Sequence, residues 1–592
     1  MIKLLKNLEK QQIGFILLSV VCIVAQVWLD LKLPDYMSNI TMLVQTENSE
    51  MSEILKNGGY MLLCALGSMA SAVIVGFFAA RIGAGLSKTL RERVFCKVLG
   101  FSMEEINNFS TPSLITRSTN DITQVQMIIT MGLQAMIKAP IMAVWAILKI
   151  SDKSWQWTLA TGVAVAVMIT MLTVLVVFAL PKFKVIQTLT DNLNRVTREN
   201  LSGLRVVRAY NAEAYQDAKF EKANDELTGN YLFTTRLMAI MSPTMTAIMS
   251  GMSLAIYWIG AYLINEAQLP MDKAVLFSDM VVFTSYAVQV IMSFMMIAMI
   301  FVMLPRAQVS AKRINEVLET KTKIYDGKRT GGINNMTGEI EFRDVSFMYP
   351  DARENVLHHI SFSAHKGETV AFIGATGSGK TTLINLIPRF YDTTEGQVLV
   401  DGVDVREYTQ NALHQKIGYV SQRAVLFSGN IKDNIAFGDN VSNNENEQEI
   451  METISKSMEI AQGKEFVDRL EDGYASPVAQ GGTNFSGGQK QRMSIARAIA
   501  RKPEIYIFDD SFSALDYKTD RVLRTALKKE TEGVTTLIVA QRIGTIKDAD
   551  RIIVLEDGEI AGYGNHKELM KTCKTYQDIA YSQLSKEEAD NE

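Results

Sequence analysis

The sequence predicts an α-helical membrane domain in its first half, fused to an α/β domain in its second half. Long apolar runs with almost no charge are confined to the residues before about 306. Beyond residue 336, short apolar strands alternate with helices, and a glycine-rich loop lies between one strand and the next helix; this alternation is typical of an α/β domain. We expect a membrane domain, a linker, an α/β domain and a charged tail at residues 1–320, 321–335, 336–582 and 583–592.

The composition excludes several classes of protein. Of the 592 residues, 47% are apolar, so the chain is not disordered. Sixty Lys and Arg against 64 Asp and Glu give a net charge of −4, and there is no strong basic field to make nucleic acid a partner. The chain has four cysteines, Cys22, Cys64, Cys96 and Cys573. They are too few and too scattered for a disulfide framework or a CxxC metal site.

Six apolar stretches are long enough to cross a membrane. A helix needs about 20 apolar residues to span the hydrocarbon core. A buried helix in a soluble core would explain one such run, but not six of them in one half of the chain. The first run ends in Trp28-Leu29-Asp30, which lacks the small residues of a signal-peptide cleavage site. The expected spans are residues 12–33, 57–81, 122–149, 154–181, 237–265 and 275–305.

The loop charges predict the orientation of these spans. Residues 81–130 and 182–236 carry more Lys and Arg than the segments on the other side. By the positive-inside rule they are cytoplasmic, which makes both termini of the chain cytoplasmic. The two segments are also long, polar and free of breaker runs, with apolar residues at helical spacing. We therefore expect helices that continue the spans into the cytoplasm, with solvated loops as the alternative.

The loop after the apolar strand 370–373 has the pattern of a phosphate-binding loop, and a helical run follows at 383–387. In this context the glycines let backbone N–H groups turn toward a phosphate at a helix N-terminus. Lys380 would neutralise the β- and γ-phosphate oxygens, and the Thr381 hydroxyl would bind Mg²⁺. The loop therefore predicts a nucleotide site that includes Gly374, Thr376, Gly377, Ser378, Gly379, Lys380, Thr381 and Thr382.

A second element of the site, which ends in an acidic residue, follows about 130 residues after the phosphate-binding loop. The apolar strand 505–508 ends in Asp509, whose carboxylate is placed to hold Mg²⁺, directly or through water. Four apolar residues before an Asp are a weak signal alone. Together with the phosphate-binding loop they favour a nucleotide-hydrolysing domain.

Between these two elements lies Asn484-Phe-Ser486-Gly487-Gly488-Gln489, which leads into a helix. With this motif the chain resembles a half-size ATP-binding cassette (ABC) exporter of the type I kind, with six spans fused to one P-loop nucleotide-binding domain. In that family the serine and glycine N–H groups of the motif meet the γ-phosphate of ATP held by the opposite subunit. The resemblance thus implies that one chain completes neither of the two sites.

Other segments resemble the same family along nearly the whole chain. Tyr349 resembles the aromatic residue that stacks on adenine, with a packing tyrosine at a strand end as the alternative. Gln422 resembles the glutamine that touches Mg²⁺, and Asp516 closes a segment that resembles the loop linking the two sites. Residues 114–121 and 200–209 resemble the intracellular extensions whose short coupling helices rest on the cassettes.

Two catalytic positions depart from the family pattern. The glutamate that acts as general base after the Mg²⁺ aspartate is replaced by Asp510, and the histidine after the next strand is replaced by Gln541. Asp is one methylene shorter, which withdraws the carboxylate by about 1.5 Å. Gln supplies neither the charge nor the proton exchange of an imidazole. Gln480 is a third departure, and none of the five histidines falls at the missing position.

These departures predict a chain whose own site binds ATP but turns it over poorly. Its intact signature would complete the site of a second half-transporter that carries the consensus Glu and His. We therefore expect the degenerate-site subunit of a heterodimeric, multidrug-type exporter that works by alternating access. Two alternatives remain open: a self-sufficient homodimeric exporter of lipids, drugs or peptides, and a nucleotide-gated, channel-like protein that does not pump.

The substrate is the least constrained part of this interpretation. Methionines are frequent in the last span, which suits a promiscuous apolar cavity, although lipid-facing or packing use also explains them. Lys138 is a stronger lead, because a charge inside the membrane is costly and usually faces a cavity or a partner. The expected substrates are amphiphilic small molecules, and the expected location is a bacterial plasma membrane.

Overall fold

The computed structural model describes residues 2–6, 8–46, 49–151, 153–333, 336–438 and 446–583. It divides into two compact units, the first made of Met1–Leu99 and Thr111–Thr320 and the second of Gly100–Ser110 and Lys321–Glu592. Each unit is described by itself. The charged tail is expected at residues 583–592. Its first residue is the last residue of a helix, and its other residues lie outside the described residues.

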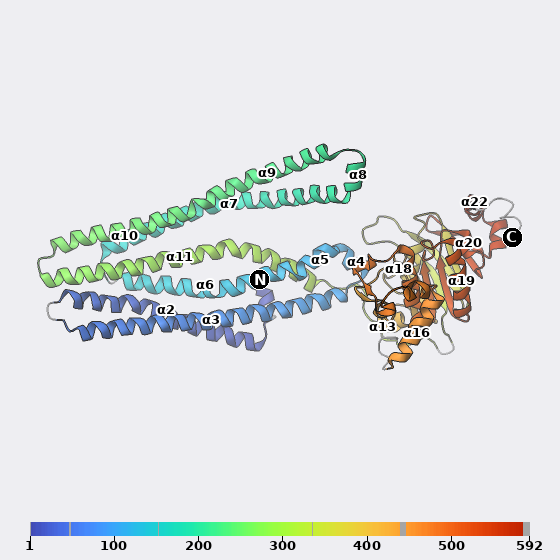
Figure 1. The fold of residues 1–592 in the computed structure, drawn as a ribbon, viewed down its shortest axis with the longest axis horizontal. Helices are drawn as coiled ribbons and strands as arrows, with labels where there is room; N and C mark the ends of the chain where they lie inside the picture. The colour runs from blue at the N-terminus through green and yellow to red at the C-terminus, as the bar shows by residue number, and fades with distance from the viewer. Residues whose placement is uncertain are drawn as a thin grey trace. The chain divides into compact units, whose positions relative to one another are not determined.

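All the regular secondary structure in the described part of the first unit is helical (Figure 1). Its longest helices far exceed the bilayer core: the 49 residues of α3 correspond to about 73 Å at 1.5 Å per residue, against a core of about 30 Å. The helices of this unit are α1 (Ile2–Leu5), α2 (Lys10–Gln45), α3 (Met51–Leu99), α5 (Thr111–Ser118), α6 (Asn120–Ser151), α7 (Trp155–Ser202), α8 (Leu204–Ala209), α9 (Glu213–Ala239), α10 (Met241–Glu266) and α11 (Pro270–Glu319).

Six helical segments of this unit are long and apolar enough to cross a membrane, which confirms the predicted six-span helical domain. The long polar segments between spans are also helical within the described residues, continuing α7 and forming α9, so they are not solvated loops. The exact limits of each span remain a prediction. The six segments are Lys10–Gln45, Met51–Leu99, Thr111–Ser151, Trp155–Ser202, Glu213–Glu266 and Pro270–Ile300.

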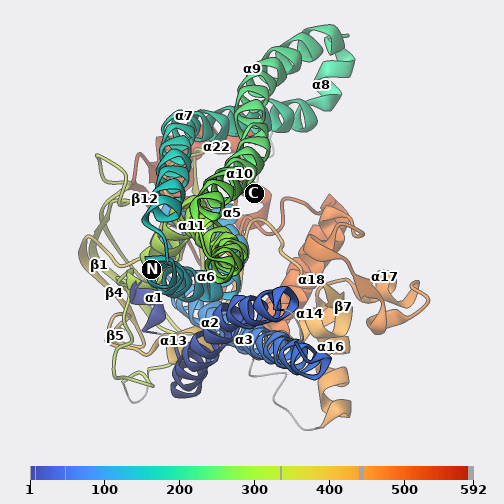
Figure 2. The ribbon, with the colours of Figure 1, turned by 90° about the vertical axis from the view of Figure 1, so that its left-hand side faces the viewer.

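Close helix contacts in this unit depend on small residues. A Cβ at Gly83 of α3 would lie 2.5 Å from the Thr130 methyl carbon of α6, and one at Gly85 would collide with the Gln12 amide of α2. Glycine at these points therefore lets three helices approach closely. Helices α7, α8 and α9 project away from this bundle in both views (Figure 2), and Leu201, Leu204 and Tyr210 there are exposed.

The second unit holds a six-stranded sheet in the order β12-β11-β3-β10-β9-β6. All pairs are parallel except β11 with β12, and the central strands β3, β9 and β10 are buried along almost their whole length. This burial on both faces explains their uniformly apolar sequences. The strands are β3 (Thr369–Gly374), β6 (Ile417–Val420), β9 (Ile505–Asp509), β10 (Thr535–Val539), β11 (Arg551–Glu556) and β12 (Glu559–Gly564).

A four-stranded antiparallel sheet, β2-β1-β4-β5, packs on the same hydrophobic core. Its strands are β1 (Ile340–Phe347), β2 (Leu357–Ala364), β4 (Glu395–Val400) and β5 (Val403–Asp404), and the short pair β7 (Gly429–Asn430) and β8 (Pro477–Val478) lies apart. The helices are α4 (Met103–Phe109), α12 (Lys380–Leu386), α13 (Gln410–Lys416), α14 (Ile431–Ile435), α16 (Glu447–Ile460), α17 (Lys464–Asp468), α18 (Gly487–Ala500), α19 (Tyr517–Glu530), α20 (Ile543–Ile546), α21 (His566–Thr572) and α22 (Lys574–Gln583), with single 3₁₀ turns at Gly473–Ala475 and Gln480–Gly482. The predicted α/β fold is therefore confirmed.

Two segments outside the expected α/β domain belong to this unit. Part of the linker lies along it, since the Gly327 N–H donates to the Tyr408 carbonyl at 2.8 Å. Helix α4, which follows α3 in the chain, is tied to the linker because Glu105 accepts a hydrogen bond from the Lys323 N–H at 3.1 Å. Asn107 of α4 also donates to the Tyr391 hydroxyl at 3.4 Å. Sequence alone could not assign these segments, because both are polar.

Tyr408, which contacts the linker, leads to a prediction about stability. Tyr408 is fully buried, and its hydroxyl donates to the Val400 carbonyl at 3.0 Å. Tyr408→Phe should lower the free energy of unfolding of this unit by about 1–2 kcal/mol, because a buried carbonyl loses a donor. Tyr517→Phe, at a side chain that is 75% exposed, is the control. Thermal unfolding of the purified chain checks this, and equal midpoints for the two variants would contradict it.

Candidate functional site

The loop between β3 and α12 has the backbone that a phosphate-binding loop requires. Gly377 and Gly379 both have φ of +92°, a conformation that glycine adopts without strain. A Cβ at Gly379 would lie 2.7 Å from a Leu357 methyl carbon, and one at Gly374 would lie 2.1 Å from the Leu555 carbonyl oxygen. Ala375, Thr376 and Gly377 are exposed. The loop therefore presents its backbone to solvent at the start of α12.

Lys380 is folded against this loop. Its ammonium donates to the carbonyls of Gly374 and Ala375 at 2.9 and 2.7 Å and to the Ser378 hydroxyl at 3.2 Å. Burial lowers the pKa of Lys380, and the nearby carboxylates of Asp510 and Asp509 oppose that shift. The charge is thus fixed at the mouth of the loop, where an anion would meet it.

Thr381 and Asp509 provide an oxygen donor pair. The Thr381 hydroxyl donates to Asp509 Oδ1 at 3.0 Å, and Asp509 is 2% exposed at the end of β9. Burial raises the pKa of Asp509, while the Thr381 hydrogen bond and the Lys380 charge lower it. A hydroxyl and a carboxylate side by side fit Mg²⁺, which binds through oxygen. Groups of three or more His, Cys, Asp or Glu that could hold a metal are absent from the described residues.

Asp510 is held by two amide side chains. Its Oδ2 accepts from Gln541 Nε2 at 3.0 Å and from Gln422 Nε2 at 3.4 Å. The residue has φ of +43°, an uncommon conformation for Asp, and its N–H donates to the Val539 carbonyl at 2.9 Å. Burial raises the pKa of Asp510, opposed first by hydrogen bonds from Ser513 and Gln422. The two positions that depart from the family pattern are therefore in direct contact.

Tyr349 lies beside the same loop. Its hydroxyl shares a hydrogen bond of 3.0 Å with the Thr382 hydroxyl, and its ring packs edge-on against Phe347 and Tyr391 at centroid distances of 4.9 and 5.3 Å. Tyr349 is only partly buried, so ring surface remains for another planar group. This placement is compatible with an adenine-stacking residue.

The signature segment forms the N-terminus of α18. Ser486 is the N-cap, and its hydroxyl accepts from the Gln489 N–H at 3.3 Å while Gln489 Oε1 accepts from the Ser486 N–H at 2.9 Å. Asn484 stabilises the preceding turn through bonds to Ala479 and Pro477. Ser486 and Gly487 are exposed, so the first N–H groups of α18 face solvent, as at anion-binding helix ends.

Asp516 is the N-cap of α19 and accepts from the Thr519 N–H at 2.9 Å, and this bond lowers its pKa. Within the part of the chain that the structure describes, no hydrogen bond joins Asp516 or the signature to the phosphate-binding loop. The predicted residues thus form one group around Gly374–Thr382 with Asp509, Asp510, Gln422 and Gln541, while the signature is separate.

Three residues outside the predicted set of site residues contact the site. Tyr391 packs on Tyr349, the Ser513 hydroxyl donates to the Asp510 carbonyl at 2.8 Å, and Gln583 of α22 donates to the Gln541 carbonyl at 2.7 Å. Ser513 belongs to a segment that the family resemblance covers. Tyr391 could have been suspected from the sequence, because it is an aromatic residue shortly after the helix that follows the phosphate-binding loop. Nothing in the sequence points to Gln583.

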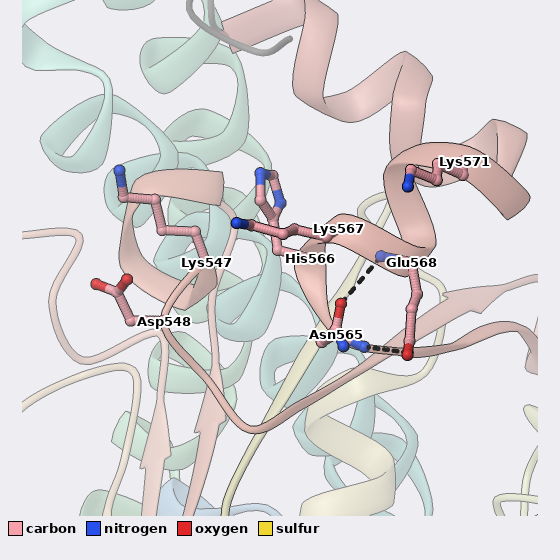
Figure 3. Close-up of a pocket in the computed structure, with 7 residues that line it drawn as sticks. All are labelled: Lys547, Asp548, Asn565, His566, Lys567, Glu568 and Lys571. Carbon is pink, nitrogen blue, oxygen red and sulfur yellow. Dashed lines mark hydrogen bonds between the residues drawn. The ribbon is translucent and has the colours of Figure 1, made fainter. Parts of the chain in front are cut away.

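A surface pocket of about 600 Å³ lies beside α20 and α21 and contains none of the predicted residues (Figure 3). Asn565 and Glu568 cap α21 there with reciprocal hydrogen bonds of 3.0 Å. His566 Nδ1 lies 2.7 Å from the Tyr576 hydroxyl, so this histidine has a structural partner away from the nucleotide site. The lining residues are Lys547, Asp548, Asn565, His566, Lys567, Glu568 and Lys571.

Comparison with protein families gives two matches that agree with the two units. The family described as the ABC transporter transmembrane region matches residues 16–294, and the ABC transporter family matches residues 357–513. The second match covers the phosphate-binding loop, the signature and Asp509. Such a domain implies ATP binding.

Characterised and uncharacterised relatives match over most of their length. An uncharacterized ABC transporter ATP-binding protein of Mycobacterium tuberculosis is 39% identical over 529 residues, which is 89% of this chain and 87% of that protein. The uncharacterized ABC transporter ATP-binding protein YfiB of Bacillus subtilis is 36% identical and covers 90% of both chains. An ATP-dependent lipid A-core flippase of Aromatoleum aromaticum is 31% identical, over 87% of this chain and 83% of that protein.

A solved structure supports the fold. The structure of a bacterial Atm1-family ABC exporter with ATP bound superposes with a TM-score of 0.78 at 21% identity, covering 96% of this chain and 98% of that one. With six apolar helices and bacterial relatives, the protein is a multi-pass bacterial membrane protein. The chain therefore belongs to the ABC transporter family, as a half-size exporter with one membrane domain and one nucleotide-binding domain.

Proposed function

We propose that this chain is the degenerate-site subunit of a heterodimeric exporter of amphiphilic, multidrug-type substrates. The observation that carries the proposal is the contact between Asp510 and Gln541, whose Nε2 lies 3.0 Å from the Asp510 carboxylate. Both residues depart from the family pattern, and they occupy one hydrogen-bonded unit.

ATP would bind at this chain's own loop. The backbone N–H groups of residues 374–379 and the Lys380 ammonium would hold the phosphates, and Tyr349 would stack on adenine. Thr381, Asp509 and Gln422 are the residues that would hold Mg²⁺, which neutralises phosphate charge when bound. Nucleotide binding therefore requires no residue that this chain lacks.

Hydrolysis is where the site would fail. Asp510 stands at the position of the general base. The carboxylate is one methylene shorter than that of Glu, and the Gln541 and Gln422 amides both hold its Oδ2. An amide N–H can fix a carboxylate in place, but it cannot exchange a proton as an imidazole does. Reach and orientation toward the attacking water would therefore limit turnover.

The signature would act on the partner. Its exposed helix N-terminus has every residue of the motif, from Ser486 to Gln489. In the proposed heterodimer, these N–H groups stabilise the γ-phosphate at the site of a half-transporter that carries the consensus Glu and His. Cassette closure would then switch the membrane domains from inward to outward opening.

The remaining features of the proposal concern topology. Both termini would be cytoplasmic, the membrane domain would occupy residues 1–320, and the linker and nucleotide-binding domain would follow at 321–335 and 336–582. The location would be the bacterial plasma membrane. The loop charges described above support this orientation.

A self-sufficient homodimeric exporter is the second candidate. Relatives about 30% identical are named ATP-dependent lipid A-core flippases, which favours lipid or amphiphilic cargo and supplies a specific reason to keep this alternative. In that case Asp510 would itself serve as a slow base. The signature and phosphate-binding loop of the same sequence would then complete each other across two copies.

Restoring both catalytic positions should raise ATP turnover. In the heterodimer, Asp510→Glu alone should add little, because Gln541 still supplies no imidazole. Asp510→Glu with Gln541→His should raise the ATPase rate of the complex about twofold, because a positioned general base contributes about 10²–10⁴-fold at a single site and would bring this site to the rate of the partner's site, which already turns over. Steady-state phosphate release from the co-purified complex measures this.

Asp472→Glu, which adds the same methylene at an exposed residue, is the matched control. Its rate should equal that of the unmodified complex. If the double substitution leaves the rate unchanged or lowers it, Asp510 and Gln541 are not the cause of weak turnover.

Variants in the signature and in the phosphate-binding loop of this chain should have unequal effects on the ATPase rate. A Cβ at Gly487 would meet no atom within 4 Å, so Gly487→Asp should leave the fold intact. Its carboxylate would repel the γ-phosphate at the partner's active site and should lower the ATPase rate of the complex at least tenfold. Lys380→Ala in this chain should lower the rate much less, because it disables only the weak site.

Gly331→Asp serves as the control, since a Cβ there also meets nothing within 4 Å. Phosphate release from the three complexes distinguishes the outcomes. Equal losses for Gly487→Asp and Lys380→Ala would support two equivalent sites and therefore the homodimeric alternative.

A further inference from the structure

The membrane unit contains an ion pair between two of its span-forming helices. Lys138 Nζ of α6 lies 3.0 Å from Asp30 Oδ2 of α2, and the two side chains are 17% and 19% exposed. Both residues lie inside helices that are apolar enough to cross a membrane. Ionisable residues within membrane-spanning segments are costly and are kept mainly for function.

Four helices converge on Asp30. Besides the contact with Lys138 on α6, Ser68 of α3 donates to Asp30 Oδ1, and Gln289 of α11 donates to the Asp30 backbone carbonyl at 3.4 Å. The carboxylate is therefore held in one position by donors from separate elements. A change in the position of Asp30 would therefore alter its contacts with the other three helices.

Two buried acceptors on the helices around Asp30 lack a donor within the described residues. Gln26 lies one turn before Asp30 on α2 and is 5% exposed. The Oε1 atoms of Gln26 and Gln289 are buried and accept no hydrogen bond within the described residues. Unpaired buried acceptors are unfavourable and are normally satisfied by a partner. Two amide oxygens and a carboxylate thus accompany a single ammonium.

Apolar side chains adjoin these polar groups. Val27 directly follows Gln26, Ile291 lies two residues after Gln289, and both are fully buried; Met142 lies one turn beyond Lys138 on α6. All three belong to one hydrophobic cluster of the membrane unit. An acceptor-rich group bordered by apolar, partly flexible side chains suits a molecule with a cationic head and an apolar body.

We propose that Asp30, Gln26 and Gln289 form a binding site for amphiphiles with a primary ammonium head group, and that Lys138 is a tethered cation that the ligand displaces. The inference rests on the proposed exporter function and names its substrate class. Without ligand, Lys138 neutralises the carboxylate. With ligand, the N–H groups of the amine reach Asp30 and the two amide oxygens.

The test is equilibrium binding of dodecylammonium to the complex of this chain and its partner in lipid nanodiscs, with empty nanodiscs as the blank. Dodecyltrimethylammonium has the charge but no N–H donor, and dodecanol has a donor but no charge. We expect dodecylammonium to bind at least tenfold more tightly than either, after the blank is subtracted. Equal affinities for the three probes would overturn the proposal.

Substitutions assign the site. Asp30→Asn should abolish the preference, and Asp30→Asn with Lys138→Met removes both charges so that no unpaired cation is left to disturb folding. Asp279→Asn is the control, because Asp279 also forms an ion pair with a lysine, Lys153, at 2.5 Å. The control should keep the tenfold preference, and a double variant that keeps it would refute the assignment.

The outcome is separable from the proposed function. Binding is read without ATP hydrolysis, so loss of the preference in the wild-type complex rejects the site even if ATP turnover is normal. Conversely, a complex that binds dodecylammonium selectively but shows no difference between its two nucleotide sites would retain this site and reject the degenerate-site heterodimer.

Discussion

The parallel pairing of β3, β10, β9 and β6 is the constraint on which the nucleotide site depends. Val539 of β10 lies opposite Asp509 of β9 and Phe372 of β3, and Phe508 of β9 lies opposite Val420 of β6. The four strands therefore end at the same edge of the sheet. The residues that follow them, including Asp510, Gln541 and Gln422, are brought together although they are far apart in sequence.

This register explains why much of the site was predictable. The phosphate-binding loop, Asp510, Gln541 and Gln422 each follow a short, mostly apolar strand, so these strand ends could be read from sequence and the residues placed at one edge. The hydrogen bonds among Asp510, Gln541 and Gln422 depend on side-chain geometry and could not be read in the same way. Tyr391 and Gln583 join the site through packing of distant elements, which leaves no local pattern.

The membrane unit shows a similar division. The six helices follow from apolar runs longer than a bilayer requires. The sequence did not indicate the partner of Lys138. Asp30 stands at the end of an apolar run, so it resembles the boundary of a span rather than part of its interior. Only the packing of α2 against α6 reveals the ion pair. The assignment of α4 and the linker to the second unit likewise depends on tertiary hydrogen bonds.

The two proposals share a physical feature, which is a carboxylate occupied by donors from its own chain. Asp510 is held by amides that cannot exchange protons, and Asp30 is held by an ammonium that, in the proposed site, another cation would replace. The first arrangement would make a site that binds without reacting, and the second would make one that is neutral until substrate arrives. Both depend on donors fixed by neighbouring secondary structure.

The most direct test of the degenerate-site account is the ATPase rate of this chain alone beside that of the chain co-purified with a half-transporter carrying the consensus Glu and His. The account predicts a rate near background for the chain alone and turnover restored by the partner. Brisk hydrolysis by the chain alone would contradict it, because Asp510 and Gln541 would then be working catalytic residues in a homodimeric pump.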